Sequence, residues 1–225
     1  MKAAIQAALI CDGELRSQNM GAYVLMIAFD LVPEHYKEHF AQKLSSLLDI
    51  HQGCLDTGFL ATPFLLDAFV KIGRRDLAIK LLWQTRMPSW LYEVEQGATS
   101  VWESWDAITP GSEPRITSYN HYAFGCVDAW IFENIAGIRA LEPGFRRVEI
   151  APDPDGVPLK YCRRSFRCEY GDLLVFWDRQ TLSVSIPCGV WAVVRWQGAS
   201  HEVGSGEYTF TEPHKEGEDQ TERTG

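Results

Sequence analysis

The chain has 225 residues, of which 46% are hydrophobic and 23% charged, a composition typical of a soluble globular protein with one large domain or two modest ones. Its formal net charge of −9 argues against nucleic acid and against an anionic membrane surface as partners. No apolar stretch approaches the roughly 20 residues that a membrane-spanning helix needs, and no secretory signal is evident, so we expect a cytoplasmic protein.

The first part of the chain has apolar residues at helical spacing, in segments separated by short turns. Helices are predicted over residues 17–31, over 34–48, from about 55 onward, and over 76–84. Ser17 is the expected N-cap of the first helix, and the side-chain oxygens of Asp56 and Thr57 are suited to cap the third. Helices and turns in this alternation are typical of helical hairpins.

Metal-ligand patterns are weak in this sequence. His35 and His39 lie four residues apart on one predicted helix face, but the glutamate of an H-E-x-x-H motif and a third ligand are missing, so we interpret this face as polar and solvated. Six cysteines are scattered without a CxxC pair, at positions 11, 54, 126, 162, 168 and 188. We interpret them as reduced, mostly buried thiols, and we expect neither a metal nor another cofactor.

The stretch from residue 96 to residue 121 concentrates aromatic and acidic side chains. Trp102 and Trp105 flank Glu103, and Asp106 follows at once. Indole faces stack on the C–H faces of sugar rings, and burial against them is expected to raise the pKa of a carboxylate toward neutrality. The pattern indicates a candidate carbohydrate site. The alternative is an aromatic cluster of the core with a glutamate at the surface.

A long helix is predicted after this stretch, over residues 118–138, because its apolar residues share one face. Ser118 is expected to be the N-cap, so His121 would lie in the first turn and Glu103 would face the helix N-terminus. Gly137 marks the expected end of the helix.

After residue 140 the helical spacing gives way to short apolar or alternating runs between Gly, Pro and Asp, which predict an all-β module. Its expected strands cover residues 147–150, 166–169, 173–177, 182–186, 191–196 and 207–211. Residues 204–206, Gly-Ser-Gly, are expected to form a hairpin turn and not a phosphate loop, because no helix or lysine follows. The polar residues 212–225 are expected to form a disordered tail.

Several segments resemble one family of enzymes. Residues 97–106, GATSVWESWD, are similar to the GATT-x-WE-x-W(D) signature of bacterial alpha-L-rhamnosidases, the six-hairpin glycosidases of glycoside hydrolase family 78. Residues 118–125, SYNHYAFG, resemble the S-x-NHYA-x-G segment of that family. Further similar stretches are residues 12–33, 55–69, 143–156 and 203–210, so the resemblance covers the chain from about residue 10 to residue 210.

The resemblance implies a multidomain α+β fold. A partial (α/α)6 six-hairpin toroid, the C-terminal half of the barrel, would span residues 1–139, and an antiparallel β-sandwich would span 140–211. It further implies an inverting alpha-L-rhamnosidase that hydrolyses terminal alpha-L-rhamnose from glycosides or polysaccharides. Glu103 would be its general base, and the sugar-binding residues would be Trp102, Trp105, Asp106 and His121.

An inverting glycosidase needs two carboxyl groups about 6.5–9.5 Å apart, and the general acid of this family lies upstream of the part that the chain resembles. Nothing in the sequence places Glu93 or Glu95 across a sugar from Glu103. We therefore expect a C-terminal fragment that is inactive alone, exposes apolar surface along 17–31 and 118–138, and associates with the missing half of the barrel or with itself. The alternatives are another (α/α)6 glycosidase, trehalase-like or glucoamylase-like, and an inactive truncated chain that binds sugar.

Overall fold

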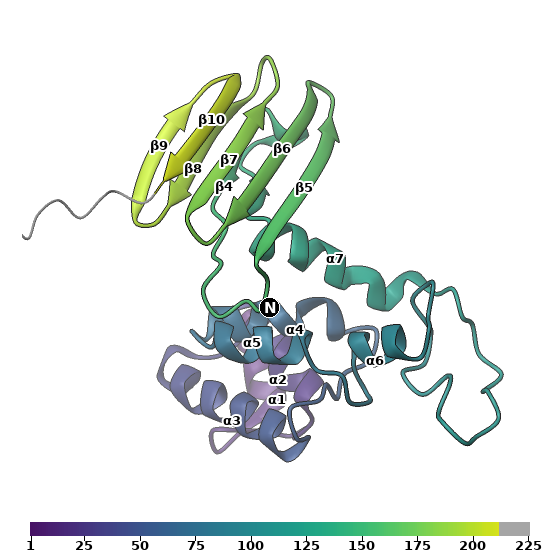
Figure 1. The fold of residues 1–225 in the computed structure, drawn as a ribbon. Helices are drawn as coiled ribbons and strands as arrows, with labels where there is room; N and C mark the ends of the chain where they lie inside the picture. Colours follow the sequence, from purple (N-terminus) through teal and green to yellow (C-terminus); the bar gives the residue numbers. More distant parts are fainter. Residues whose placement is uncertain (212–225) are drawn as a thin grey trace, which may run out of the picture. The chain divides into compact units, whose positions relative to one another are not determined.

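The computed structural model describes residues 1–211, and the chain divides into two compact units between Trp130 and Ile131 (Figure 1). The first unit is helical, and the second consists mainly of β-strands. Within the described residues, no helix is both long enough and apolar enough to cross a membrane. The tail predicted over residues 212–225 lies outside the described part of the chain.

The helical unit contains short helices joined by tight turns. Its α-helices are α1 (Lys2–Leu9), α2 (Met20–Ala28), α3 (Lys37–Ile50), α4 (Thr62–Lys71), α5 (Arg75–Leu82), α6 (Trp90–Glu95) and α7 (Val127–Trp130). The 3-10 helices η1 (Glu34–Tyr36) and η2 (Tyr122–Cys126) precede α3 and α7, and the strands β1 (Ile10–Cys11) and β2 (Glu14–Leu15) pair antiparallel. The helices predicted in the regions of α2, α3, α4 and α5 are confirmed with shifted ends, whereas α1 and α6 were not predicted.

The helix α4 lies at the centre of this unit, in contact with α2, α5 and η2. Its inner face contributes Leu65 and Phe69, which are fully buried. Tyr23 of α2 and Phe40 of α3 meet edge to face, with ring centroids 5.2 Å apart. Burial of each such side chain is worth about 1.5–3 kcal/mol, so packing of these faces, more than helix propensity, stabilises helices of this length.

Two predicted helix caps are wrong. The N-cap of α2 is Asn19, whose Oδ1 accepts a hydrogen bond from the Ala22 amide at 2.8 Å, and not Ser17. The helix α4 begins at Thr62 without a side-chain cap. Both residues that were predicted to cap it have other partners, since the Thr57 hydroxyl lies 2.8 Å from that of Thr62 and Asp56 pairs with His51 at 3.1 Å.

The predicted long helix over 118–138 is also wrong. Regular structure begins only with η2 after His121, and α7 is followed by a short π-helix, η3 (Ile131–Ile135). The reason lies in the backbone amides of Ser118 and His121, which bond to the Glu103 carboxylate and to the Val101 carbonyl. Amides engaged across a loop in this way hold the chain extended where a helix was expected to start.

The second unit contains two four-stranded sheets, with strand orders β10-β7-β6-β5 and β3-β4-β8-β9. The elements are β3 (Ile138–Ala140), the 3-10 helix η4 (Pro143–Phe145), β4 (Arg147–Ile150), β5 (Tyr161–Cys168), β6 (Gly171–Asp178), β7 (Thr181–Ile186), β8 (Trp191–Trp196), β9 (Ala199–Val203) and β10 (Gly206–Thr211). Neighbouring strands are antiparallel except β4 and β8, which run parallel. The predicted β-sandwich is confirmed, and its first strand begins two residues before the expected start.

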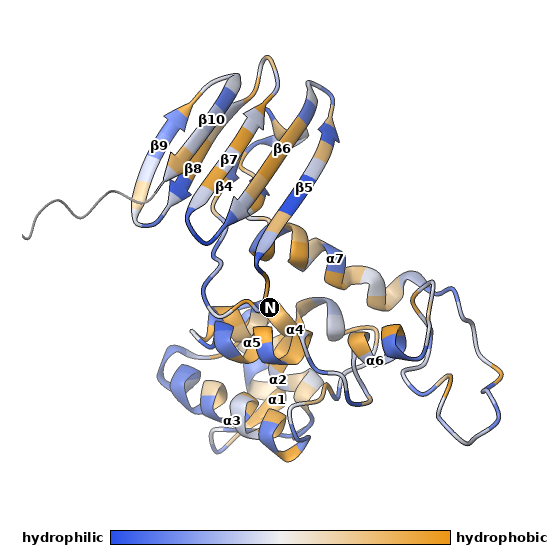
Figure 2. Ribbon diagram, viewed as in Figure 1, coloured by the Kyte–Doolittle hydropathy of each residue, from blue (hydrophilic) through white to orange (hydrophobic). Residues whose placement is uncertain are grey.

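Burial alternates along the central strands β6 and β7, and Figure 2 shows a continuous hydrophobic stretch in the middle of β6. Trp177 of β6 is fully buried, and its indole N–H donates to the Ile135 carbonyl at 2.7 Å. Gly137, with a φ of 79°, lies so close to the segment after β4 that an added Cβ would be 2.1 Å from the Pro152 nitrogen. Only glycine fits at this position, which lies between η3 and β3.

Two strands and one turn of this unit were mispredicted. The strand β9 is a polar edge strand whose residues are almost all exposed, so no apolar alternation marks it, and β3 was assigned to the end of the helix. Residues 204 and 205 connect β9 of one sheet to β10 of the other, and residue 206 is the first of β10. They are therefore not a hairpin turn, because β10 takes its hydrogen-bonding partner from β7.

All six cysteines are free, but they are less buried than expected. Only Cys54 is buried, while Cys11 and Cys188 are exposed and the other three are half-buried. The apolar surface predicted along 17–31 and 118–138 is largely buried, as Tyr23 and Phe124 illustrate, although 54% of Phe29 and 90% of Tyr122 are accessible to solvent. A shallow, open hollow of about 490 Å³, lined mainly by apolar atoms, lies between α2 and residues 58–61.

Candidate functional site

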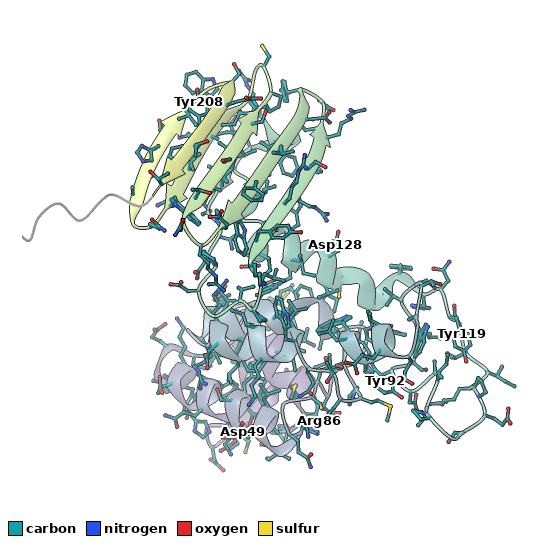
Figure 3. The ribbon with its side chains drawn as sticks, viewed as in Figure 1. Asp49, Arg86, Tyr92, Tyr119, Asp128 and Tyr208 are labelled. Carbon is teal, nitrogen blue, oxygen red and sulfur yellow. The ribbon has the colours of Figure 1, made fainter. Side chains whose placement is uncertain are left out.

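The residues of the candidate carbohydrate site lie on a long loop between α6 and η2, drawn in teal at the right of Figure 1. Backbone hydrogen bonds join its two limbs in antiparallel order. These bonds run from His121 N to Val101 O, from Glu103 N to Ser118 O and from Arg115 N to Ala107 O, with lengths of 2.8, 2.9 and 2.9 Å. The Tyr119 hydroxyl closes the loop further by donating to the Ala107 carbonyl at 3.1 Å. Figure 3 labels Tyr119 on this loop.

Glu103 is half-buried, and hydrogen-bond donors hold its carboxylate. Its Oε2 accepts from the Ser118 amide at 3.0 Å and from the Thr117 hydroxyl at 3.1 Å. The amide bond first, and then the hydroxyl bond, lower the pKa of Glu103 below its ordinary value of 4.5. The predicted rise of this pKa is wrong, because two hydrogen bonds to one carboxyl oxygen stabilise the ionised form more than burial disfavours it. Glu103 is therefore ionised at neutral pH.

The two tryptophans beside Glu103 differ in their accessibility. Trp102 is only 2% exposed, and its ring packs edge-on against Tyr119 with centroids 5.8 Å apart, so it presents no free face to a sugar. Trp105 is half-buried; its indole stacks on Phe124 at 4.0 Å and meets Trp90 edge-on at 5.7 Å. The Trp105 Nε1 is buried without a hydrogen-bond partner among the described residues.

Asp106 is engaged in an ion pair that the sequence analysis did not anticipate. Both of its carboxyl oxygens lie 2.6 Å from Nη1 of Arg115, on the opposite limb of the loop. Both side chains are partly exposed, so the pair contributes little to stability by itself. Its geometry nevertheless links the two limbs below the loop tip. The only sign of this ion pair in the sequence was a basic residue, Arg115, among the polar residues of the loop tip.

His121 is the N-cap of η2, and not a residue of a helical first turn. Its Nδ1 accepts from the Ala123 amide at 3.4 Å, an arrangement that places the ring proton of the neutral form on Nε2. The imidazole stacks on Phe59 with centroids 4.9 Å apart and on Tyr122 with centroids 5.7 Å apart. Phe59 comes from the segment before α4, and no local pattern in the sequence indicates that it belongs to this site.

Glu93 is a buried carboxylic acid directly behind the loop, on α6. It is 3% exposed, and its Oε2 accepts from the Trp102 amide at 3.2 Å. Burial raises its pKa to about 7, and the Trp102 hydrogen bond opposes this rise only in part. Its Oε1 is buried without a partner among the described residues. The sequence offered Glu93 and Glu95 equally as acidic neighbours, but Glu95 is exposed at the end of α6.

The two histidines at helical spacing are separated from this site and do not form a metal centre. His39 Nε2 lies 2.9 Å from Oε1 of Glu14, which also pairs with Lys43 at 3.0 Å, while the His35 ring contacts the Tyr36 ring at a tilt, with centroids 4.1 Å apart. Among residues 1–211 no group of three or more His, Cys, Asp or Glu side chains is arranged to hold a metal ion.

The chain thus combines a helical unit that carries an aromatic, acidic loop with a β-sandwich. Residues 1–135 match the family model of the bacterial alpha-L-rhamnosidase 6 hairpin glycosidase domain, and residues 137–209 match that of the bacterial alpha-L-rhamnosidase C-terminal domain. The chain therefore belongs to the bacterial alpha-L-rhamnosidase family of six-hairpin glycosidases.

Individual relatives agree with this assignment. An alpha-L-rhamnosidase of Streptomyces avermitilis is 34% identical over 240 residues, which cover 94% of this chain and 23% of that protein. One from Formosa agariphila is 38% identical over 160 residues, covering 70% of this chain and 17% of that protein. The crystal structure of Streptomyces avermitilis alpha-L-rhamnosidase complexed with L-rhamnose gives a TM-score of 0.86 at 33% identity, covering 93% of this chain and 23% of that chain. The chain thus spans less than a quarter of the length of these relatives.

Proposed function

We propose that this chain is part of an inverting alpha-L-rhamnosidase in which Glu103 is the general base that activates water. The substrate is a terminal alpha-L-rhamnose on a glycoside or polysaccharide. The hydrogen bonds of Glu103 are the main support: one carboxyl oxygen is held by Ser118 and Thr117, and the pKa is lowered, so the group is anionic at neutral pH. Within residues 1–211 the other oxygen has no hydrogen-bond donor, and it is the atom that accepts the proton of water.

The other loop residues have distinct roles in this proposal. The half-buried indole of Trp105 contacts the sugar, and the Nε2–H of His121 donates a hydrogen bond to it. Trp102 is buried, so it supports the loop and does not stack on the sugar. Asp106 keeps the loop limbs together through Arg115. The relatives named as alpha-L-rhamnosidases support rhamnose as the sugar.

The general acid, in this proposal, comes from outside residues 1–211. Asp106 is paired with Arg115, and Glu93 is buried beneath the loop, so neither is placed to protonate a leaving group across the sugar from Glu103. Further protein, from the same chain or from a second one, would also cover the apolar hollow beside α2. The chain by itself then binds sugar at most and does not hydrolyse it. The division into a glycosidase domain over 1–139 and a sandwich over 140–211 stays a prediction.

The test uses a protein extended upstream to the length of the relatives and an aryl alpha-L-rhamnoside. Glu103→Gln keeps the size of the side chain but cannot take a proton, so kcat is expected to fall about 10²–10⁴-fold with KM little changed. Glu95→Gln, an exposed glutamate, is the matched control and is expected to keep full activity. Proton NMR of the released sugar reports the expected inversion. Near-full activity of Glu103→Gln would show that another carboxylate is the base.

A further inference from the structure

Helix α6 holds the candidate loop at several points. The Ser89 side chain caps the helix by accepting from the Tyr92 amide at 3.1 Å. On the loop side, the Tyr92 hydroxyl donates to the Ile108 carbonyl at 2.8 Å, and Glu93 accepts from the Trp102 amide at 3.2 Å. Figure 3 labels Tyr92 on this helix. The contact made by Glu93 is the one adjacent in sequence to Glu103.

We propose that Glu93 is a positioning residue: through the Trp102 amide it fixes the backbone that presents Glu103, and with it the hydrogen bonds that hold the Glu103 carboxylate. Its importance for catalysis rests on the proposed function, but its effect on Glu103 does not.

The first step of the argument concerns the Trp102 amide. The bond between this amide and Glu93 is buried, and a buried amide without an acceptor costs about 1–3 kcal/mol in general. Trp102 is itself buried, so water does not replace the missing acceptor. The backbone at residue 102 is therefore held in place by a buried side chain nine positions earlier, on α6.

The second step leads from Trp102 to Glu103. The Glu103 amide donates to the Ser118 carbonyl at 2.9 Å, and the Ser118 amide donates back to the Glu103 carboxylate at 3.0 Å. This reciprocal pair requires the backbone of residue 103 to keep its register with the opposite limb. The hydrogen bond from the Ser118 amide is also the largest cause of the lowered pKa of Glu103. A change in the alignment of the two loop limbs would therefore change that pKa.

The third step explains why an acid is found at a buried position. A carboxyl group accepts the Trp102 hydrogen bond whether or not it is ionised, because the proton of the neutral form takes the other oxygen. The unpartnered Oε1 of Glu93 is that second oxygen. Burial, which raises the pKa of Glu93 to about 7, is consistent with a largely neutral group at mildly acidic pH. If Glu93 only filled space in the core, a methionine of similar size could replace it. If Glu93 positions the loop, methionine could not replace it, because methionine offers no oxygen to accept the Trp102 hydrogen bond.

The experiment uses the full chain and requires no sugar turnover. Carboxyl ¹³C NMR of glutamate-labelled protein follows the titration of Glu103, assigned with Glu103→Gln, and amide exchange follows Trp102. Glu93→Met is expected to raise the pKa of Glu103 toward 4.5 and to speed exchange of the Trp102 amide about tenfold or more. Glu93→Gln, which keeps an acceptor, is expected to leave both unchanged. Glu95→Met is the matched control on the exposed end of α6.

A second measurement needs no variant, and so covers the case in which Glu93→Met does not fold. In the unmodified chain the amide resonance of Trp102 is expected to shift with the same midpoint as the Glu93 carboxyl. The proposal is overturned if the Trp102 amide ignores that titration, if Glu93→Met leaves the Glu103 pKa in place, or if Glu93→Gln moves it equally. The general-base role of Glu103 is tested only by the turnover assay of Glu103→Gln. The two proposals can therefore fail independently of each other.

Discussion

Replacing Glu93 with glutamine is expected to remove a loss of stability that the helical unit undergoes as the pH rises. The pKa of Glu93 is about 7 in the folded chain, against an ordinary value of 4.5, because the group is buried. Below pH 4.5 the carboxyl is protonated in both the folded and the unfolded state, and its ionisation makes no difference. As the pH rises from 4.5 to about 7, the unfolded chain releases the proton while the folded chain keeps it, so the free energy of unfolding falls.

The size of the effect follows from the two pKa values. Each pKa unit corresponds to 1.36 kcal/mol, so the folded chain loses about 3 kcal/mol through Glu93 between pH 4.5 and pH values above 7. Glutamine keeps an acceptor for the Trp102 amide but does not ionise. The variant is therefore expected to match the natural chain near pH 4.5 and to be more stable than it at pH 8.

Urea unfolding followed by tryptophan fluorescence at pH 5 and pH 8 measures this difference, since Trp102 and Trp105 lie in the loop and Trp90 lies on α6. Glu95→Gln is the control: Glu95 lies on the same helix but is exposed, so this variant should give the same stability difference from the natural chain at both pH values. The reasoning would be refuted if the stability difference between Glu93→Gln and the natural chain did not change between pH 5 and pH 8.

Three further changes test the packing and capping of the fold by their effect on the unfolding midpoint. Gly137→Ala is expected to destabilise the sandwich by about 3 kcal/mol or more, because the new Cβ would lie 2.1 Å from the Pro152 nitrogen at a φ of 79°; a variant as stable as the natural chain would contradict this close approach. Trp177→Phe is expected to cost about 2–3 kcal/mol by leaving the buried Ile135 carbonyl without its donor, and an unchanged midpoint in thermal unfolding would argue against that bond. Asn19→Ala should cost about 1 kcal/mol in chemical unfolding and Asn19→Asp much less, whereas equal losses would show that the cap is not the cause.

The parts of the fold that could be predicted from sequence are those in which local pattern and burial agree. The strands β4 and β8 were predicted with their observed ends, because β4 alternates polar and apolar residues, β8 is a short apolar run, and turns bound both. The helix α3 was predicted because its apolar residues recur at helical spacing along one face, and that face is buried. The motifs around Glu103 and His121 indicated the family, which the matches to both domain models confirm.

The errors at the candidate site share one physical cause, namely hydrogen bonds between residues distant in sequence. The Ser118 amide bonds to a carboxylate 15 residues away, so no helix starts there and the carboxylate becomes more acidic instead of less. The burial of Glu93 depends on the path of the backbone at Trp102, which α6 and the loop determine together. Arg115 was overlooked because its partner, Asp106, lies across the loop. None of these partners is visible in a local window of sequence.

The crossing of residues 204 and 205 from β9 to β10 has a consequence for solubility. The strand β10 pairs with β7 over six residues and forms one edge of its sheet. Removal of the chain from Gly206 onward would make β7 the new edge, and β7 contains alternating apolar residues without a single charge. An uncharged edge of this kind recruits strands from other molecules, whereas β10 presents a negative charge at Glu207. The last strand thus protects its neighbour from intermolecular β-pairing, and a chain that ends before Gly206 is expected to aggregate while still retaining most of its core.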